Sequence, residues 1–82
     1  MEFHLSTHAE KRVLSRGIKP EWIAAALDFP ARIENDMLDP ALVHVLLPVP
    51  EKGFRVLRVI YNETIAPVTI VTAYFDDTLR DI

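Results

Sequence analysis

The sequence predicts a single α+β domain over residues 1–82: a short N-terminal strand and a helical hairpin packed on a three- to four-stranded antiparallel sheet. Three observations predict this fold. Apolar residues follow helical spacing in the first part of the chain, β-branched and aromatic residues dominate two later runs, and the connections between those runs are short. With 82 residues, the chain can bury one modest core and no second lobe.

The N-terminal part predicts a short strand followed by a helix over 7–16. Residues 3–5 alternate apolar and polar side chains, as a half-buried strand does. Ser6 or Thr7 then suits the N-cap, and Glu10 follows Thr7 at capping-box spacing. Gly17 is a typical residue just beyond the end of a helix.

A second helix is predicted over 20–28, because Pro20 suits a first helical position and Pro30 ends the helix. After Ala31 the composition becomes typical of β structure, and antiparallel strands are expected over 42–47, 54–61 and 68–75. The side chains expected to be among the most buried are Trp22, Ile23, Leu27, Val56 and Val71.

Composition excludes several classes of protein. Half of the residues are hydrophobic and 26% are charged, which excludes a disordered chain. No cysteine is present, so disulfides, thiolate zinc sites and a cysteine nucleophile are excluded. The uncharged runs are too short for a membrane-spanning helix, and the N-terminus lacks the pattern of a signal peptide. We therefore expect a cytoplasmic protein that does not bind membranes.

The net charge of −3 does not indicate a general nucleic-acid binder, but the charges are unevenly distributed. Residues 1–19 carry an excess of two positive charges, whereas residues 20–49 carry an excess of four negative ones. His8, Arg12 and Arg16 are spaced four residues apart and form one row on the first helix. Histidine can transfer a proton near neutral pH and arginine can bind phosphate oxygens, so this row suits a phosphodiester. The alternative is a solvated helix face on which His8 caps the first turn.

Three residues of the predicted strands are further candidates. Arg58 interrupts an otherwise apolar strand face, so it needs a partner or a ligand. The alternative is an edge arginine that extends to solvent or pairs with Glu10 or Glu63. Strict alternation places Thr72 and Tyr74 on one face with Val68 and Ile70. Their hydroxyls can border a cleft, or the two residues can simply be strand formers. The spacing of His4 and His8 suits two metal ligands only if both lie on one helix. Ser6 or Thr7 begins the helix after His4, so we expect neither a metal nor a cofactor. His44 is expected to be a hydrogen-bonded histidine of the core or the sheet edge.

The sequence resembles the family of domain of unknown function 4258. The resemblance is carried by the segments Thr7–Arg12, Arg16–Ile18, Leu27–Pro30, Phe54–Val59 and Val68–Tyr74. Such domains are grouped with RelE-like and BrnT-like small toxins, within the wider set of barnase, EndoU and colicin-type ribonuclease folds. The resemblance therefore implies a metal-independent ribonuclease that is often paired with an antitoxin protein.

Carried over to this chain, the resemblance suggests His8, Arg12 and Arg16 as catalytic residues, with Arg58, Thr72 and Tyr74 beside them. The leading hypothesis is a toxin-type endoribonuclease: His8 moves a proton, and the arginines stabilise charge on the phosphate. The expected partners are RNA and a cognate antitoxin-like protein. The alternative is a non-catalytic module that binds a protein through a basic groove or a sheet edge. The sequence leaves the oligomeric state open.

Overall fold

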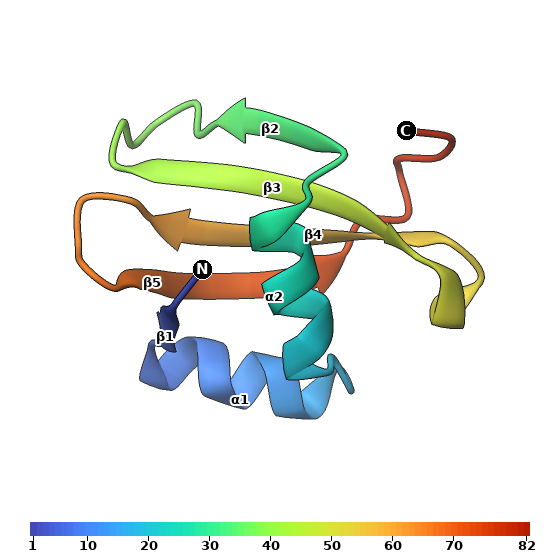
Figure 1. Ribbon diagram of the computed structural model, residues 1–82, viewed down its shortest axis with the longest axis horizontal. Helices are drawn as coiled ribbons and strands as arrows, with labels where there is room; N and C mark the ends of the chain where they lie inside the picture. The colour runs from blue at the N-terminus through green and yellow to red at the C-terminus, as the bar shows by residue number, and fades with distance from the viewer.

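Five strands form one sheet in the order β1-β5-β4-β3-β2 in the computed structural model, which describes residues 1–82 (Figure 1). The elements in chain order are β1 (Phe3–Leu5), α1 (Thr7–Ser15), α2 (Pro20–Asp28), β2 (Arg32–Asn35), β3 (Leu42–Val49), the 3-10 turn η1 (Pro50–Lys52), β4 (Arg55–Asn62) and β5 (Val68–Phe75). The predicted α+β class, both helices and the three long strands are therefore confirmed. Neither helix is long and apolar enough to cross a membrane.

The sheet has five strands and is mixed, which corrects the predicted antiparallel sheet of three to four strands. β3, β4 and β5 are antiparallel, but β1 pairs in parallel with β5 through Phe3 and Leu5. β2 pairs antiparallel with β3 and was not predicted as a strand. Its four residues include an arginine, a glutamate and an asparagine, so β propensity gives little signal there.

The ends of α1 are fixed by local hydrogen bonds. The Ser6 hydroxyl caps the helix by accepting from the Ala9 amide at 3.1 Å. At the other end, Gly17 has a positive φ of 63°, its amide donates to Leu14, and the Ile18 amide donates to Val13 at 3.0 Å. This pattern is a Schellman motif, and it places Ile18 in the core directly after the turn.

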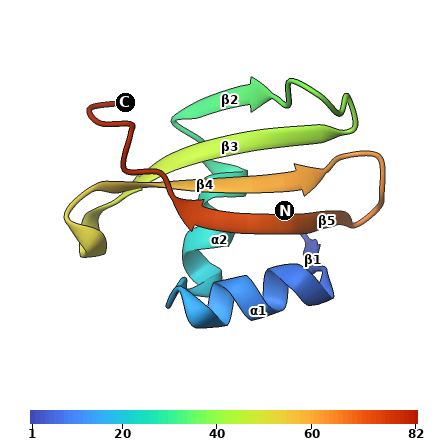
Figure 2. The ribbon, with the colours of Figure 1, turned by 180° about the vertical axis from the view of Figure 1, so that it is seen from behind.

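The two helices cover different parts of the sheet. α2 lies across one face and contacts β3 and β4, whereas α1 runs beside β5 at the edge of the sheet (Figure 1). The predicted hairpin therefore does not lie flat on one face. The other face of the sheet carries no helix, as the view from behind shows (Figure 2). We call it the open face.

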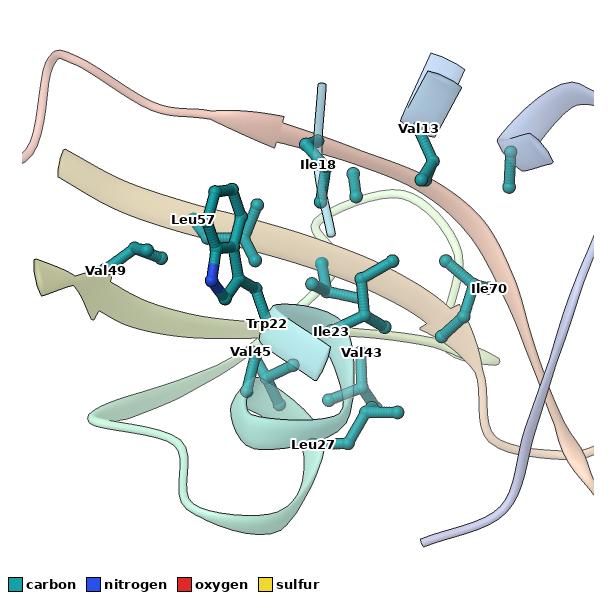
Figure 3. Packing of buried hydrophobic residues seen from close by; sticks show 14 residues of the cluster. Val13, Ile18, Trp22, Ile23, Leu27, Val43, Val45, Val49, Leu57 and Ile70 are labelled. Carbon is teal, nitrogen blue, oxygen red and sulfur yellow. The ribbon is translucent and has the colours of Figure 1, made fainter. Parts of the chain in front are cut away.

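The core lies between α2 and the sheet. In Figure 3 the α2 side chains of Trp22 and Ile23 point toward the strands, among Val45, Leu57 and Ile70. Of the five residues expected to be most buried, Trp22, Ile23, Leu27 and Val56 are buried. Val71 is only half-buried, because a β-bulge interrupts the pairing of β4 with β5 at this residue.

The bulge also separates residues that the sequence placed on one face. Thr72 pairs with Ile60, and Ile70 pairs with Tyr61, so Val71 has no cross-strand partner. Thr72 and Tyr74 therefore lie on the open face, whereas Ile70 points into the core. The expectation that they share the face of Ile70 is wrong for this reason.

Replacing Gly17 with alanine should lower the free energy of unfolding by about 1 kcal/mol, because a Cβ is disfavoured at positive φ. No heavy atom lies within 4 Å of the added carbon, so the cost is conformational and not steric. Urea unfolding measures it. Gly53→Ala is the matched control, since Gly53 has a φ of 66° and an equally open site. A much larger loss in Gly17→Ala than in the control would contradict this explanation.

Candidate active site at the α1–β5 edge

The predicted row on α1 is present and exposed. His8, Arg12 and Arg16 all lie at the surface, and the Arg12 Nε donates to His8 Nε2 at a long 3.4 Å. None of the three forms a salt bridge with a carboxylate, although six ion pairs occur elsewhere in the chain. The row therefore keeps its positive charge available to an anionic ligand. We call it the basic row.

Arg16 joins the basic row to the sheet. It is the C-cap residue of α1, and its Nη1 donates to the Ala73 carbonyl of β5 at 2.8 Å. That carbonyl is accessible because β1 pairs with β5 only as far as Ile70. The guanidinium also lies 5.9 Å from the centre of the Tyr74 ring, within the range of a cation–π contact. Two predicted site residues from distant parts of the chain therefore meet here.

A shallow hollow beside this contact is lined by four residues from α1, β4 and β5: Arg16, Arg55, Tyr74 and Phe75. Arg55 lies over the Phe75 ring at 4.6 Å and forms two 3.0 Å hydrogen bonds with Asp77. These bonds raise the pKa of Arg55 and lower the pKa of Asp77. The arginine that lines the hollow with Arg16 is therefore Arg55, and its charge is already neutralised.

Arg58 lies on the open face at the centre of an ionic network. Its guanidinium donates to Asp76 and to Glu34, each at 3.0 Å, and its side chain is only 11% exposed. Asp76 in turn accepts from the Thr78 amide at 3.1 Å. We call Glu34, Asp36, His44, Arg58 and Asp76 the open-face network.

His44 completes this network through both ring nitrogens. Nδ1 lies 2.8 Å from Nη1 of Arg58, and Nε2 lies 2.7 Å from Oδ1 of Asp36. Arginine can only donate, so Nδ1 must accept and the proton of a neutral ring is on Nε2, facing the carboxylate. Neither nitrogen is left free for a substrate.

The acidic members of the network are stabilised in their charged form. The hydrogen bond from Arg58 lowers the pKa of Glu34, and the contact with His44 lowers the pKa of Asp36. The pKa of Asp76 is lowered by its hydrogen bonds with Thr78 and then with Arg58. Burial opposes the charge on Arg58, but the bonds to Glu34 and Asp76 outweigh it and raise the pKa.

Arg58 does not line the hollow beside Tyr74, where Arg55 is the second arginine. Arg58 points to the open face, where its acceptors are Glu34 and Asp76 in place of the expected Glu10 or Glu63. Thr72 lies on that face too. His4 is in β1 and His8 in α1, so the two do not share a helix.

Glu34, Asp36 and Asp76 were not among the predicted site residues, and no partner was predicted for His44. One signal was available. An arginine that interrupts an apolar strand face requires acidic acceptors on neighbouring strands, and Glu34 and Asp36 have the i, i+2 spacing of one strand face.

Comparison with known proteins identifies the family. The model of the family "Domain of unknown function (DUF4258)" matches residues 5–75, which is most of the chain. The chain belongs to this family. The match spans α1 and β5, and with them the basic row and Tyr74. No curated protein and no solved structure matches the chain.

Replacing Arg58 with methionine should lower the free energy of unfolding by about 3 kcal/mol, because Glu34, Asp76 and His44 then lose their shared donor. The same substitution at Arg55 is the matched control. That arginine is in the same strand but pairs with the exposed Asp77, so its loss should cost much less than the loss of Arg58. Urea denaturation of both variants measures the difference, and equal losses would contradict a structural role for the open-face network.

Acidification should destabilise the domain. Glu34, Asp36 and Asp76 have folded-state pKa values below their ordinary values of 4.5, 3.8 and 3.8. Their charged forms therefore stabilise the fold above those ordinary values, and this contribution is lost as the pH falls through the lowered ones. Free energies of unfolding measured from neutral pH downward should fall below about pH 5. The decline should be shallower in Arg58→Met, and an identical decline would assign the effect to other groups.

Proposed function

We propose that the chain is a metal-independent endoribonuclease whose site is the α1–β5 edge. The observation that carries this proposal is the position of Arg16, which extends from the end of α1 onto Tyr74. The basic row to which it belongs forms no salt bridge with a carboxylate. Exposed arginines beside an aromatic ring suit a single-stranded nucleic acid, because phosphates and bases can bind side by side.

In this proposal Arg12 and Arg16 bind phosphate oxygens of the RNA, and Tyr74 stacks on a base. Arg16 already contacts Ala73 and Tyr74, so it is held in place before the ligand arrives. Thr72 lies on the same face as Tyr74 and can donate a hydrogen bond to the ligand. Arg58 has its donors occupied, so its role is to hold the open face together next to Tyr74, with which it pairs across the strands.

His8 is the group that transfers the proton. Its Nε2 is the acceptor nitrogen of the ring, because it accepts a long hydrogen bond from Arg12. When Arg12 turns to the phosphate in this proposal, the lone pair of Nε2 is free to take the proton of a 2′-hydroxyl. The 2′-oxygen then attacks the adjacent phosphorus, and a new P–O2′ bond replaces the P–O5′ bond. The 5′-oxygen leaves with the proton returned by the imidazolium, and the product is a 2′,3′-cyclic phosphate.

The family resemblance to RelE-like and BrnT-like toxins supports the same reaction class and extends it to a partner. A cognate antitoxin-like protein would inhibit the enzyme by covering the basic row with acidic side chains. Opposite charges orient the two proteins as they meet and raise the rate of association.

An RNA cleavage assay with EDTA present tests the activity. His8→Ala should reduce the rate of cleavage about a hundred- to ten-thousandfold, the usual contribution of general acid–base catalysis. His4→Ala is the matched control, because His4 is also an exposed histidine but lies outside the basic row. Unchanged cleavage by His8→Ala, or no cleavage by the unaltered protein, would refute the proposed enzyme.

The second candidate is a binding module without catalysis. The engagement of both His44 nitrogens and of the Arg58 donors favours it, because these half-buried groups then serve the fold alone. Binding to single-stranded RNA separates the two candidates. A His8→Ala protein that still binds but no longer cleaves indicates the enzyme, whereas binding without any cleavage by the unaltered protein indicates the module.

Binding should also be weak and sensitive to salt, because the net charge is −3 and few phosphates are neutralised. The logarithm of the affinity should fall with the logarithm of the salt concentration. Arg12→Ala and Arg16→Ala should each make that slope shallower by about the contribution of one phosphate contact. Lys11→Ala is the control on the same helix. Titrations at several salt concentrations give the slopes, and an equal effect of the Lys11 variant would argue against a defined row.

A further inference from the structure

The β2 edge of the sheet has backbone groups that no strand occupies. β2 is the last strand in the sheet order, and its only neighbour is β3. The Asp36 amide donates to Leu42, and hydrogen-bonded pairs alternate along an antiparallel ladder. Arg32 and Glu34 therefore bond toward β3, whereas the amide and carbonyl groups of Ile33 and Asn35 point outward.

The side chains along this edge are unusually apolar for a surface. Ile33 is 63% exposed, although it pairs with the buried Val45 on the helix-covered side. Just before the strand, Phe29 is 77% exposed, and just after it Met37 and Leu38 are 98% and 94% exposed. Exposed apolar residues beside an unpaired edge are the features of a site where another strand adds to the sheet.

We propose that the occupant of this edge is a second copy of the chain, bound through antiparallel pairing of the two β2 strands about a twofold axis at Ile33. The two five-stranded sheets then form one continuous sheet. In this register Ile33 faces the Ile33 of the partner subunit, and their outward amide and carbonyl groups exchange both hydrogen bonds of a pair. The pairing does not depend on the proposed ribonuclease activity.

The charges of β2 favour a copy of itself over an unrelated strand. Antiparallel pairing about Ile33 places Arg32 opposite the Glu34 of the partner subunit and repeats the contact on the other side of the axis. Both side chains lie on the open face, and within one chain they are already 3.3 Å apart. Opposite charges facing each other across strands stabilise the pair, whereas like charges destabilise it. The order Arg32-Ile33-Glu34 is thus complementary to itself.

The apolar residues at the two ends of β2 fit the same register. Reversing the strand brings the end of β2 that precedes Met37 in one chain toward the end that follows Phe29 in the other, because both residues lie four positions from Ile33. Apolar side chains that are exposed in the single chain are then covered in pairs at both ends. The contact is small, so we expect a weak dimer whose population depends on concentration.

Sedimentation velocity over a wide range of protein concentration tests the dimer. The unaltered chain should shift from monomer to dimer, and hydrogen exchange at the Ile33 and Asn35 amides should slow as the dimer forms. Ile33→Lys should remain monomeric, since two positive charges then meet at the axis. Leu14→Lys is the matched control: Leu14 is 82% exposed on α1, and its replacement should leave the dimer intact.

Arg32→Glu is a second variant, which leaves the apolar edge unchanged. It should raise the dissociation constant at least about tenfold, because like charges then face each other twice across the axis. A monomer at all concentrations would overturn the proposal, as would a dimer that survives Ile33→Lys or is lost equally in the Leu14 control. Uptake of an added strand-forming peptide by a chain that stays monomeric would assign the edge to a different partner.

Discussion

The pairing of Arg58 is the interaction on which much of this structure depends. A guanidinium that is only 11% exposed requires acceptors, since an uncompensated charge in such a place is costly. Glu34 supplies one acceptor from β2, His44 another from β3, and Asp76 a third from the segment after β5. One side chain therefore links the edge strand, the centre of the sheet and the start of the C-terminal segment on the face that no helix covers.

This constraint explains why the fold was predictable only in part. The helices and long strands follow from caps and from runs of apolar residues, as in Ser6, Gly17 and the segment Val68–Phe75. β2 has too few strand-forming residues to be recognised alone, and its place depends on pairing with β3 and on Glu34 reaching Arg58. β1 is visible as a strand, but its parallel partner is not, because a long-range pairing leaves no local pattern.

The candidate site was likewise predictable where it depends on one helix and not where it depends on long-range contacts. The spacing of His8, Arg12 and Arg16 is a property of one helix, so it could be derived from the sequence and is present in the structure. That Arg16 reaches Tyr74 depends on the strand order and on where β1 ends, which the sequence does not show. The position of the carboxylates decides the rest: the basic row has none within salt-bridge distance, whereas Arg58 has two. Sequence alone shows how many charges a chain has, and the fold determines which of them remain uncompensated.

The bulge at Val71 shifts the alternation of side chains along β5 by one residue. Before it, Ile70 faces the core and the strand pairs with β1; after it, Thr72 and Tyr74 face away from the helices. Strict alternation cannot provide both arrangements, because residues 70, 72 and 74 would then share one face. If Val71 were instead paired regularly, β5 would have to choose between burying Ile70 and presenting Tyr74 to Arg16. The extra residue thus lets Ile70 and Tyr74 occupy opposite faces of one strand, while Ala73 and Phe75 still face the core.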